Sequence, residues 1–464
     1  MSTLAVPDPA VVRFLETHTA SAAALPGHGV PWLDELRAAG LARFRAQGFP
    51  TPRSEAWKYT DVAPIARRSF RPASGEDETP AEAIREAVAR AARGIDADHR
   101  LVFVNGRYRP EFSATGEARD GRVVGSLAGH LRDDPESLRR HLAQPPRRAD
   151  GFAALNAAFA ADGLYVVLPA GSGAGVIHLC FVAAGEDVAS HARSLVVAGP
   201  GSSAVLVESY VSAGDTPGLV NVATDLALAA GASVEHYRAQ QENDRSYHVG
   251  AVTVRQADDS RYRILALGLG GRIGRCDIDV SLDAEGAECT LEGLYAVRGR
   301  QHIDFHTRID HRKPRGVSRE LFKGILDGHG RGVFNGKVVV HEDAQRTDAT
   351  QANHNLLLSR HAEIDTKPEL EIYADDVKCS HGATVGQLDE DMLFYLRSRG
   401  LDEGLARATL TYAFAEEVLG RIGLVGLRRQ AAAALARIVP GAEAALGGEL
   451  DLLLGREAAE DPVR

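Results

Sequence analysis

The chain contains 464 residues, of which 25% are charged and 44% are hydrophobic, and its formal net charge is −10. This length suggests about two to four domains and a core large enough to need no disulfide or metal for stability. The acidic balance argues against a protein that binds mainly nucleic acid, because phosphate binding requires clustered positive charge.

The sequence also gives no sign of export or membrane insertion. The first 20 residues carry Asp8 and Glu16 and lack the basic start and apolar run of a secretory signal. The longest uncharged apolar stretch, residues 163–185, is interrupted by Pro169 and several glycines, which predicts strands and turns rather than a membrane-spanning helix. A cytoplasmic location is therefore expected.

Residues 1–160 are predicted to form a mainly helical region with a short strand pair. A helical period over Pro31–Gly48 begins with a proline, which suits the first turn of a helix. An Ala- and Glu-rich stretch over 80–95 predicts another helix, and two apolar runs within 101–112 predict the strand pair. The segment 144–148, Gln-Pro-Pro-Arg-Arg, is interpreted as a linker or a helix break.

Residues 161–387 are predicted to form a right-handed parallel β-helix-like solenoid, which makes the fold mainly β. Six segments repeat an apolar strand, a tight polar or glycine turn and a second strand: Ser194–Ser209, Asp225–Arg238, Ala251–Leu265, Asp279–Gly293, Gly324–Val340 and Leu356–Tyr373. The first four turns, centred at Gly201, Gly231, Asp259 and Gly286, are nearly evenly spaced, as in solenoids whose units pack on their neighbours. A β-sandwich or jelly roll is the alternative, because hairpins give the same local pattern.

Residues 388–464 are predicted to be helical. Asp389 and Asp402 are placed to cap two successive helices. In the second of these, apolar residues recur at spacings of three and four along one stripe: Leu401, Leu405, Ala408, Tyr412, Ala415, Leu419 and Ile422. This stripe is either core, which is the commoner case, or a docking face for another subunit. Two shorter Ala- and Leu-rich helices are expected to end the chain.

The chain lacks the P-loop of a nucleotide hydrolase. Gly336-Lys337 resembles the end of that motif, but Arg331 stands where a glycine is required. Val338 also replaces the Ser or Thr that would hold magnesium. ATP hydrolysis of this class is therefore not expected from this chain.

His302, Asp304 and His306 alternate along a predicted strand and therefore share one face. Two imidazoles and a carboxylate can ligate a metal. The interpretation that we favour is the solvated side of a half-buried strand, because such strands alternate in this way.

Cys379 and His381 lie two residues apart on a predicted strand, so both side chains point the same way. Thiolate and imidazole together suit iron, zinc or copper, and Lys378 is expected to lower the pKa of the thiol. Two ligands do not complete a site, so a metal here would need ligands from elsewhere in the fold or from another chain. The alternative is a buried cysteine beside a surface histidine. The other cysteines, Cys180, Cys276 and Cys289, are predicted to be buried small apolar residues.

From residue 304 to residue 400 the chain resembles the SufB/SufD family of iron–sulfur cluster assembly proteins. The matching sequences are Phe-Lys-Gly-Ile at 322–325, Val-Phe-Asn-Gly-Lys-Val at 333–338, Ala-Gln-Arg-Thr-Asp-Ala at 344–349, Asn-His-Asn-Leu-Leu-Leu-Ser at 353–359, Ala-Glu-Ile-Asp-Thr-Lys-Pro at 362–368, the Cys379–His381 stretch, and Leu-Phe-Tyr-Leu-Arg-Ser-Arg-Gly at 393–400. Trp-Lys-Tyr-Thr at 57–60 is similar as well, whereas the intervening part resembles the family by architecture only.

The resemblance implies a β-helix core between helical ends and a non-catalytic scaffold role. In this family two paralogues pair with each other and bind the ATPase SufC, whose ATP cycle is thought to open their interface. The partners implied for this chain are SufB and SufC, and indirectly the cysteine desulfurase system and acceptor proteins. For the isolated chain, a monomer and a homodimer are both compatible with the sequence.

The resemblance also implies where the chemistry lies. A nascent iron–sulfur cluster or iron is assembled at the interface with SufB, and the family's histidine falls on His381. Cys379 matches a neighbouring thiol of lesser expected importance. SufC is expected to dock on the C-terminal helical region, on Leu401, Leu405, Tyr412 and Leu419. The complex has been linked to reduced flavin, for which the sequence indicates no site.

A stand-alone β-helix enzyme that uses a metal or acts on carbohydrate is the competing hypothesis. It would require carboxylates that converge on one face of the solenoid. Glu363 and Asp365, two apart on a predicted strand, are the nearest pair. A third hypothesis is a SufB-like paralogue that acts alone.

Overall fold

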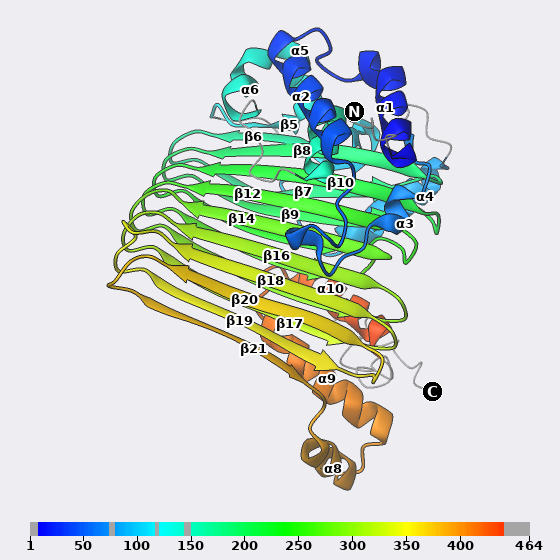
Figure 1. The fold of residues 1–464 in the computed structure, drawn as a ribbon, viewed down its shortest axis with the longest axis vertical. Helices are drawn as coiled ribbons and strands as arrows, with labels where there is room; N and C mark the ends of the chain where they lie inside the picture. The colour runs from blue at the N-terminus through cyan, green and yellow to red at the C-terminus, as the bar shows by residue number, and fades with distance from the viewer. Residues whose placement is uncertain (1–7, 74–78, 117–119, 143–149, 440–464) are drawn as a thin grey trace, which may run out of the picture.

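Two long parallel sheets face each other and form a solenoid, with helices at both of its ends (Figure 1). A computed structural model describes residues 8–73, 79–116, 120–142 and 150–439. Successive strands alternate between the two sheets, so each coil of the chain adds one strand to each sheet. The fold is therefore mainly β with a solenoid core, which confirms the predicted class.

The first sheet is ordered β20-β18-β16-β14-β12-β10-β8-β6-β5, and β1 pairs with β8. Its strands are β1 Arg71–Pro72, β5 Val123–Ser126, β6 Leu164–Leu168, β8 Val188–Ala198, β10 Gly218–Leu228, β12 Tyr247–Gln256, β14 Ile273–Leu282, β16 His302–His311, β18 Arg331–Val340 and β20 Glu363–Ile372. The second sheet is ordered β21-β19-β17-β15-β13-β11-β9-β7-β2-β3, and β4 pairs with β2. Its strands are β2 His99–Val104, β3 Arg107–Tyr108, β4 Ala114–Thr115, β7 Gly173–Ala183, β9 Ser203–Ser212, β11 Ser233–Gln240, β13 Arg261–Gly268, β15 Glu288–Val297, β17 Val317–Leu326, β19 Asp348–Leu357 and β21 Lys378–Gly386.

Parallel, in-register pairing distinguishes this core from the sandwich alternative. Val188 of β8 lies beside Gly218 of β10, and Leu219 lies beside Tyr247 of β12. Alternate side chains point inward, and the apolar ones form one continuous core between the sheets. A sandwich built from hairpins would require antiparallel pairs, which here occur only where β3 and β4 meet β2 and β5 meets β6, among the described strands.

The predicted turns are present, but two turns at the same edge of the solenoid were missed. Gly201, Gly231 and Gly286 have positive φ angles of 64°, 66° and 70°, as tight turns between strands require. In the turns between β16 and β17 and between β18 and β19, the positive φ angles of 61° and 60° belong to Arg315 and Arg346, so no glycine marks these positions. The predicted segments 324–340 and 356–373 consequently span turns at the opposite edge of the solenoid, between β17 and β18 and between β19 and β20.

The helices before the solenoid match the predictions only in part. They are α1 Pro9–Ser21, α2 Pro31–Gln47, α3 Ala63–Ala66, α4 Ala81–Ala92, α5 Leu127–Asp133, α6 Pro135–Leu142 and α7 Gly151–Phe159. Both α2 and α4 were predicted, as was the strand pair β2–β3. Nearly every residue of α7 is buried, so this helix has no amphipathic period that could reveal it. The predicted linker at 144–148 lies outside the described residues.

Three helices follow the solenoid: α8 Glu390–Ser398, α9 Glu403–Leu419 and α10 Val425–Ile438. The Asp389 carboxylate accepts from the backbone at the start of α8, and Asp402 does the same for α9, as predicted. Both α9 and α10 pack on the outer face of the second sheet, whereas α8 projects beyond the last coil (Figure 1). The last helix expected from the sequence lies beyond residue 439, outside the described part. None of the described helices is long and apolar enough to cross a membrane.

Candidate functional site at the open end of the solenoid

The last coil of the solenoid, formed by β20 and β21, leaves both sheets open. Each of these strands is the terminal member of its sheet, so one backbone edge of each is unpaired among the described strands (Figure 1). Large apolar side chains are exposed beside it, with Ile372 at 42%, Tyr373 at 62% and Val385 at 49%. Proteins usually cover or blunt such edges, because an unpaired strand offers hydrogen bonds to another chain. We call β20 and β21 the open end.

Cys379 and His381 lie on β21, at the open end. Parallel pairing places Cys379 beside Ala349 and His381 beside Gln351, both of which face the solenoid interior. Cys379 is half-buried against the inner core, and His381 is exposed. Burial raises the pKa of the Cys379 thiol, so the expectation that Lys378 would lower it is wrong. Lys378 precedes Cys379 on the strand and therefore faces the opposite side of the sheet.

Cys379 and His381 form an incomplete set of metal ligands among the residues that the structure describes. Throughout the described residues, no three His, Cys, Asp or Glu side chains gather closely enough to hold a metal ion. Zinc and iron–sulfur sites typically take four ligands. Further ligands for a metal or cluster at Cys379 and His381 would have to come from outside the described residues, for example from another chain.

Two buried polar residues lie behind His381 in the same inward-facing column. Glu320 of β17, Gln351 of β19 and His381 of β21 are neighbours in register. The Gln351 Nε2 donates a hydrogen bond to Glu320 Oε2 at 2.7 Å, and both side chains are almost fully buried. Burial raises the pKa of Glu320 to about 7. Sequence reasoning missed this pair, although Glu and Gln at inward positions of otherwise apolar strands were a readable signal.

The stability of the protein is expected to fall between about pH 4.5 and pH 7 because of Glu320. The folded state keeps this carboxyl protonated up to a pKa of about 7, whereas the unfolded chain releases the proton near the ordinary glutamate pKa of 4.5. The unfolded state therefore binds fewer protons across this window, and the loss is on the order of 3 kcal/mol. Denaturant unfolding measures this effect. Between about pH 5 and about pH 8, the free energy of unfolding should fall less in Glu320→Gln than in the parent chain. An equal fall in the free energy of unfolding of Glu320→Gln and of the parent chain would contradict the role of Glu320.

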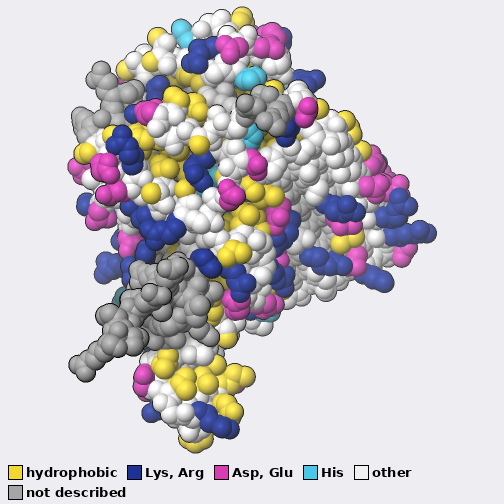
Figure 2. Space-filling view, turned by 180° about the vertical axis from the view of Figure 1, so that it is seen from behind, with side chains coloured by type: hydrophobic (Ala, Val, Ile, Leu, Met, Phe, Trp, Pro, Cys, Tyr) yellow, Lys and Arg dark blue, Asp and Glu magenta, His cyan; other side chains and the backbone are white. Residues whose placement is uncertain are grey.

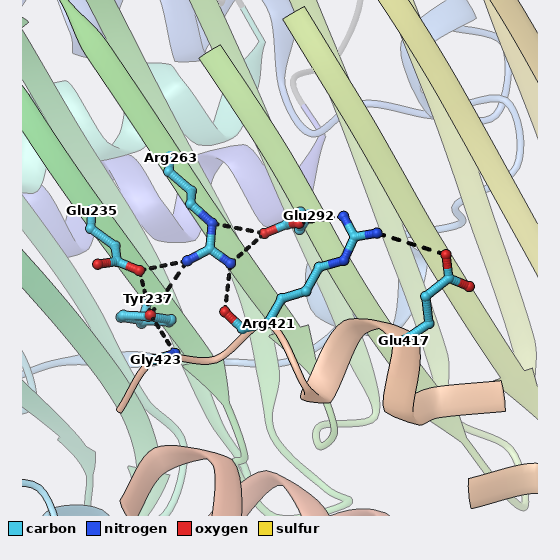
Figure 3. Close-up of polar contacts among 7 residues, drawn as sticks. All are labelled: Glu235, Tyr237, Arg263, Glu292, Glu417, Arg421 and Gly423. Atoms are coloured by element: carbon cyan, nitrogen blue, oxygen red, sulfur yellow. Dashed lines mark hydrogen bonds and ion pairs between the residues drawn. The ribbon is translucent and has the colours of Figure 1, made fainter. Parts of the chain in front are cut away.

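The C-terminal helices are fastened to the second sheet by a polar network (Figure 3). Arg263 of β13 donates to Glu292 at 2.7 Å and to the Arg421 carbonyl oxygen at 2.6 Å. The Arg421 guanidinium also donates a hydrogen bond to Glu292 at 2.7 Å. The Tyr237 hydroxyl accepts from the Gly423 backbone N–H at 2.9 Å. The link between α9 and α10 is thus held at both of its ends.

One half of the apolar stripe on α9 therefore belongs to the core of the chain. Ala415, Leu419 and Ile422 are at most 4% exposed and pack against the sheet. Leu419, a predicted docking residue, is fully buried and presents no surface to a partner in this conformation. Tyr412 is partly buried against the same cluster, and Leu401 and Leu405 keep partial exposure.

A different group of apolar side chains is exposed at the projecting helix. Met392, Phe394 and Tyr395 of α8 are 57%, 75% and 56% exposed, and we call them the α8 patch. Figure 2 shows hydrophobic side chains gathered on this projecting end of the molecule. The sequence prediction placed the docking face on α9 instead, because α9 has the longer apolar stripe.

Two family descriptions match this chain. Residues 181–414 match "SUF system FeS cluster assembly, SufBD core domain", and residues 11–174 match "SufBD protein N-terminal region". The chain belongs to the SufBD family. This membership confirms the resemblance found in the sequence, and it now extends over the N-terminal region and most of the solenoid.

Several SufBD relatives align with most of the chain. An iron–sulfur cluster assembly SufBD family protein of Synechocystis is 35% identical over 393 residues, covering 82% of this chain and 85% of the relative. The iron–sulfur cluster assembly protein SufD of Escherichia coli is 33% identical over 406 residues, covering 86% and 92%. The chloroplastic protein ABCI7 of Arabidopsis thaliana is 28% identical over 444 residues, covering 91% and 90%.

The SufBD N-terminal region covers the His302–Asp304–His306 face of β16. The Asp304 carboxylate is 1% exposed and accepts from Thr60 at 2.5 Å and from Arg275 at 2.8 Å. Although burial alone would raise it, the pKa of Asp304 is lowered by the Arg275 guanidinium. The carboxylate is thus engaged by a hydroxyl and a guanidinium. This face is neither the metal site considered from the sequence nor the solvated surface that was favoured, because residues 55–60 lie over it.

Proposed function

We propose that this chain is a non-catalytic scaffold subunit of an iron–sulfur cluster assembly complex, which pairs with a SufB subunit through the open end. The open end carries this proposal, because it combines unpaired strand edges, exposed apolar side chains and an incomplete pair of ligands. Strand edges from a second SufBD chain would satisfy the backbone groups of β20 and β21. The same contact would bring the missing ligands to Cys379 and His381.

In this proposal a nascent cluster, or iron on its way to one, is cargo held between the two subunits. His381 supplies a neutral imidazole nitrogen, and the partner subunit supplies thiolate or carboxylate groups. Cys379 has a secondary role, because its raised pKa disfavours the thiolate that binds metal. The chain itself then needs no sulfur-accepting cysteines, and its other three cysteines are buried.

Co-expression with the SufB and SufC subunits tests this proposal. A tag on this chain alone is expected to recover both partners, with iron and sulfide present only when SufB is included. Identification of the recovered chains and chemical analysis of iron and sulfide provide the measurement. Purification of a chain that never associates with SufB, or that carries a complete cluster by itself, would refute the scaffold role.

The proposed docking surface for the ATPase subunit SufC is the α8 patch together with Leu401 and Leu405. We propose this surface instead of the complete α9 stripe, because Ala415, Leu419 and Ile422 of that stripe are buried in the core of the chain. Deletion of all residues from 388 onward is a poor test. It would also remove α9 and α10, which bury the outer face of the second sheet.

Phe394→Asp is expected to weaken SufC binding by about 2 kcal/mol or more, roughly 30-fold in Kd. Aromatic side chains that are exposed in the free chain and become buried in the complex contribute most of the energy of an interface. The change should leave stability within about 0.5 kcal/mol, since Phe394 is 75% exposed. Titration calorimetry with purified SufC measures the effect. Val425→Asp is the matched control, because Val425 is 63% exposed at the start of α10, outside the patch. Equal affinity of the Phe394 variant and the parent chain would exclude the α8 patch as the docking surface.

A further inference from the structure

Gln351 carries a buried acceptor that lacks a donor. Its side chain is 3% exposed, and its Nε2 donates to Glu320 at 2.7 Å. Its Oε1 is buried and has no hydrogen-bond partner among the described residues. An unpaired buried carbonyl oxygen is costly, so such an atom calls for a donor that this structure of the single chain does not supply.

The amide of Gln351 is held in place on two sides. On one side Glu320 accepts from its Nε2. On the other side lies Gly336 of β18, where a Cβ atom would come within 2.3 Å of that Nε2. The amide therefore occupies space that exists only because residue 336 is a glycine. With the nitrogen bound to Glu320, the oxygen is left as the acceptor.

The next inward position toward the open end belongs to His381. It is the register partner of Gln351 on β21, one strand closer to the open end. The adjacent buried amide, Asn353, has its own partners, because its Nδ2 donates to the Phe322 carbonyl oxygen and its Oδ1 accepts from Thr366. Cys379 is only a weak donor. His381 is the register neighbour of Gln351 on the side of the open end, and its imidazole carries an N–H that can donate to the unpaired oxygen.

We infer that Gln351 is a positioning residue for His381, whose ring N–H it accepts at Oε1 when His381 binds iron. This inference rests on the proposed role of His381 as a ligand. Accepting one ring N–H fixes the tautomer and leaves the other nitrogen available to the metal. Ligating histidines are commonly held in this way by a second hydrogen-bonding partner. Glu320 contributes indirectly, because it fixes the orientation of the amide.

The test compares Gln351→Met with Asn353→Leu in the full complex with SufB and SufC. Gln351→Met keeps an unbranched side chain of similar size but removes the acceptor. Asn353→Leu also removes a buried amide on β19, but its register neighbour is Ala383 instead of His381. Anaerobic titration with Fe²⁺ alone is expected to show about tenfold weaker binding for Gln351→Met, within the usual range for lost supporting contacts.

A second readout separates positioning from a general loss of structure. In the Zn²⁺-loaded complex, exchange of the His381 ring N–H with water is expected to accelerate roughly three- to tenfold in Gln351→Met, the equivalent of one lost hydrogen bond. The Asn353→Leu complex should match the parent in both measurements. Parent-like iron affinity and exchange in Gln351→Met, or equal changes in both variants, would overturn the positioning role. Full iron binding by His381→Ala would overturn the proposed ligand itself.

Discussion

His381→Ala is expected to abolish cluster assembly while leaving the fold and the complex almost unchanged. His381 is exposed on the last strand of its sheet, so its removal should change stability by no more than about 0.5 kcal/mol. Interface energy lies mainly in buried apolar and aromatic anchors, so pairing with SufB should persist. Cluster-dependent growth and the iron content of the purified complex measure the effect, and both should fall to background.

Cys379→Ala is the matched comparison for this prediction. Cys379 shares the strand and the inward face with His381, but burial raises the pKa of its thiol. A milder defect in growth and iron content is therefore expected from Cys379→Ala. Normal growth with normal iron content in His381→Ala would remove the support for this site. A more severe defect in Cys379→Ala would reverse the roles of the two residues.

Arg275→Met is expected to cost about 3–5 kcal/mol of stability, the usual result of removing one partner from a buried ion pair. The Arg275 guanidinium is 1% exposed and donates to Asp304 and Asp277 at 2.8 Å each. It also lies 3.9 Å from the centre of the Trp57 ring, and its Nη1 donates to the Ala56 carbonyl oxygen. The substitution would leave buried carboxylates without their cation and loosen the N-terminal segment. Denaturant unfolding measures the free energy directly.

Arg261→Ala controls for the general effect of losing an arginine from the solenoid. Arg261 forms an exposed pair with Glu288 at 3.5 Å, where both side chains are more than half exposed. Exposed pairs of this kind contribute about 0–1 kcal/mol, so this variant should unfold close to the parent. Equal free energies of unfolding for Arg275→Met and Arg261→Ala would show that the buried Arg275 network does not stabilise the fold as predicted.

The solenoid could be predicted because its signals are local. Glycines at the tight turns and apolar strands between them repeat along the chain, and each coil pairs with the one before it. The covering of β16 could not be predicted in the same way. Thr60 reaches Asp304 across 244 positions of sequence. The alternation of His302, Asp304 and His306 gives only a shared face, and it carries no information about what lies over that face.

The α9 stripe illustrates a second limit of sequence patterns. Helical spacing identifies which residues share a face, but burial against the chain's own sheet and burial against a partner produce the same spacing. The structure separates the two cases, because Leu419 is fully buried while Phe394 on the shorter helix is 75% exposed. At the open end, sequence proximity was enough to pair Cys379 with His381. Gln351 was missed because its proximity to His381 comes from strand register.

The long-range contact between Thr60 and Asp304 has a consequence for synthesis of the chain on the ribosome. The N-terminal segment emerges early, but its docking surface on β14 and β16 appears only some 240 residues later. At typical elongation rates this interval lasts about 10–50 s. During that time Trp57, which ends only 2% exposed, can stack on Phe152 but lacks the Arg275 guanidinium that lies over its ring in the finished fold. The order of synthesis therefore makes closure of this segment over the solenoid a late folding step, and Trp57 stays incompletely covered until then.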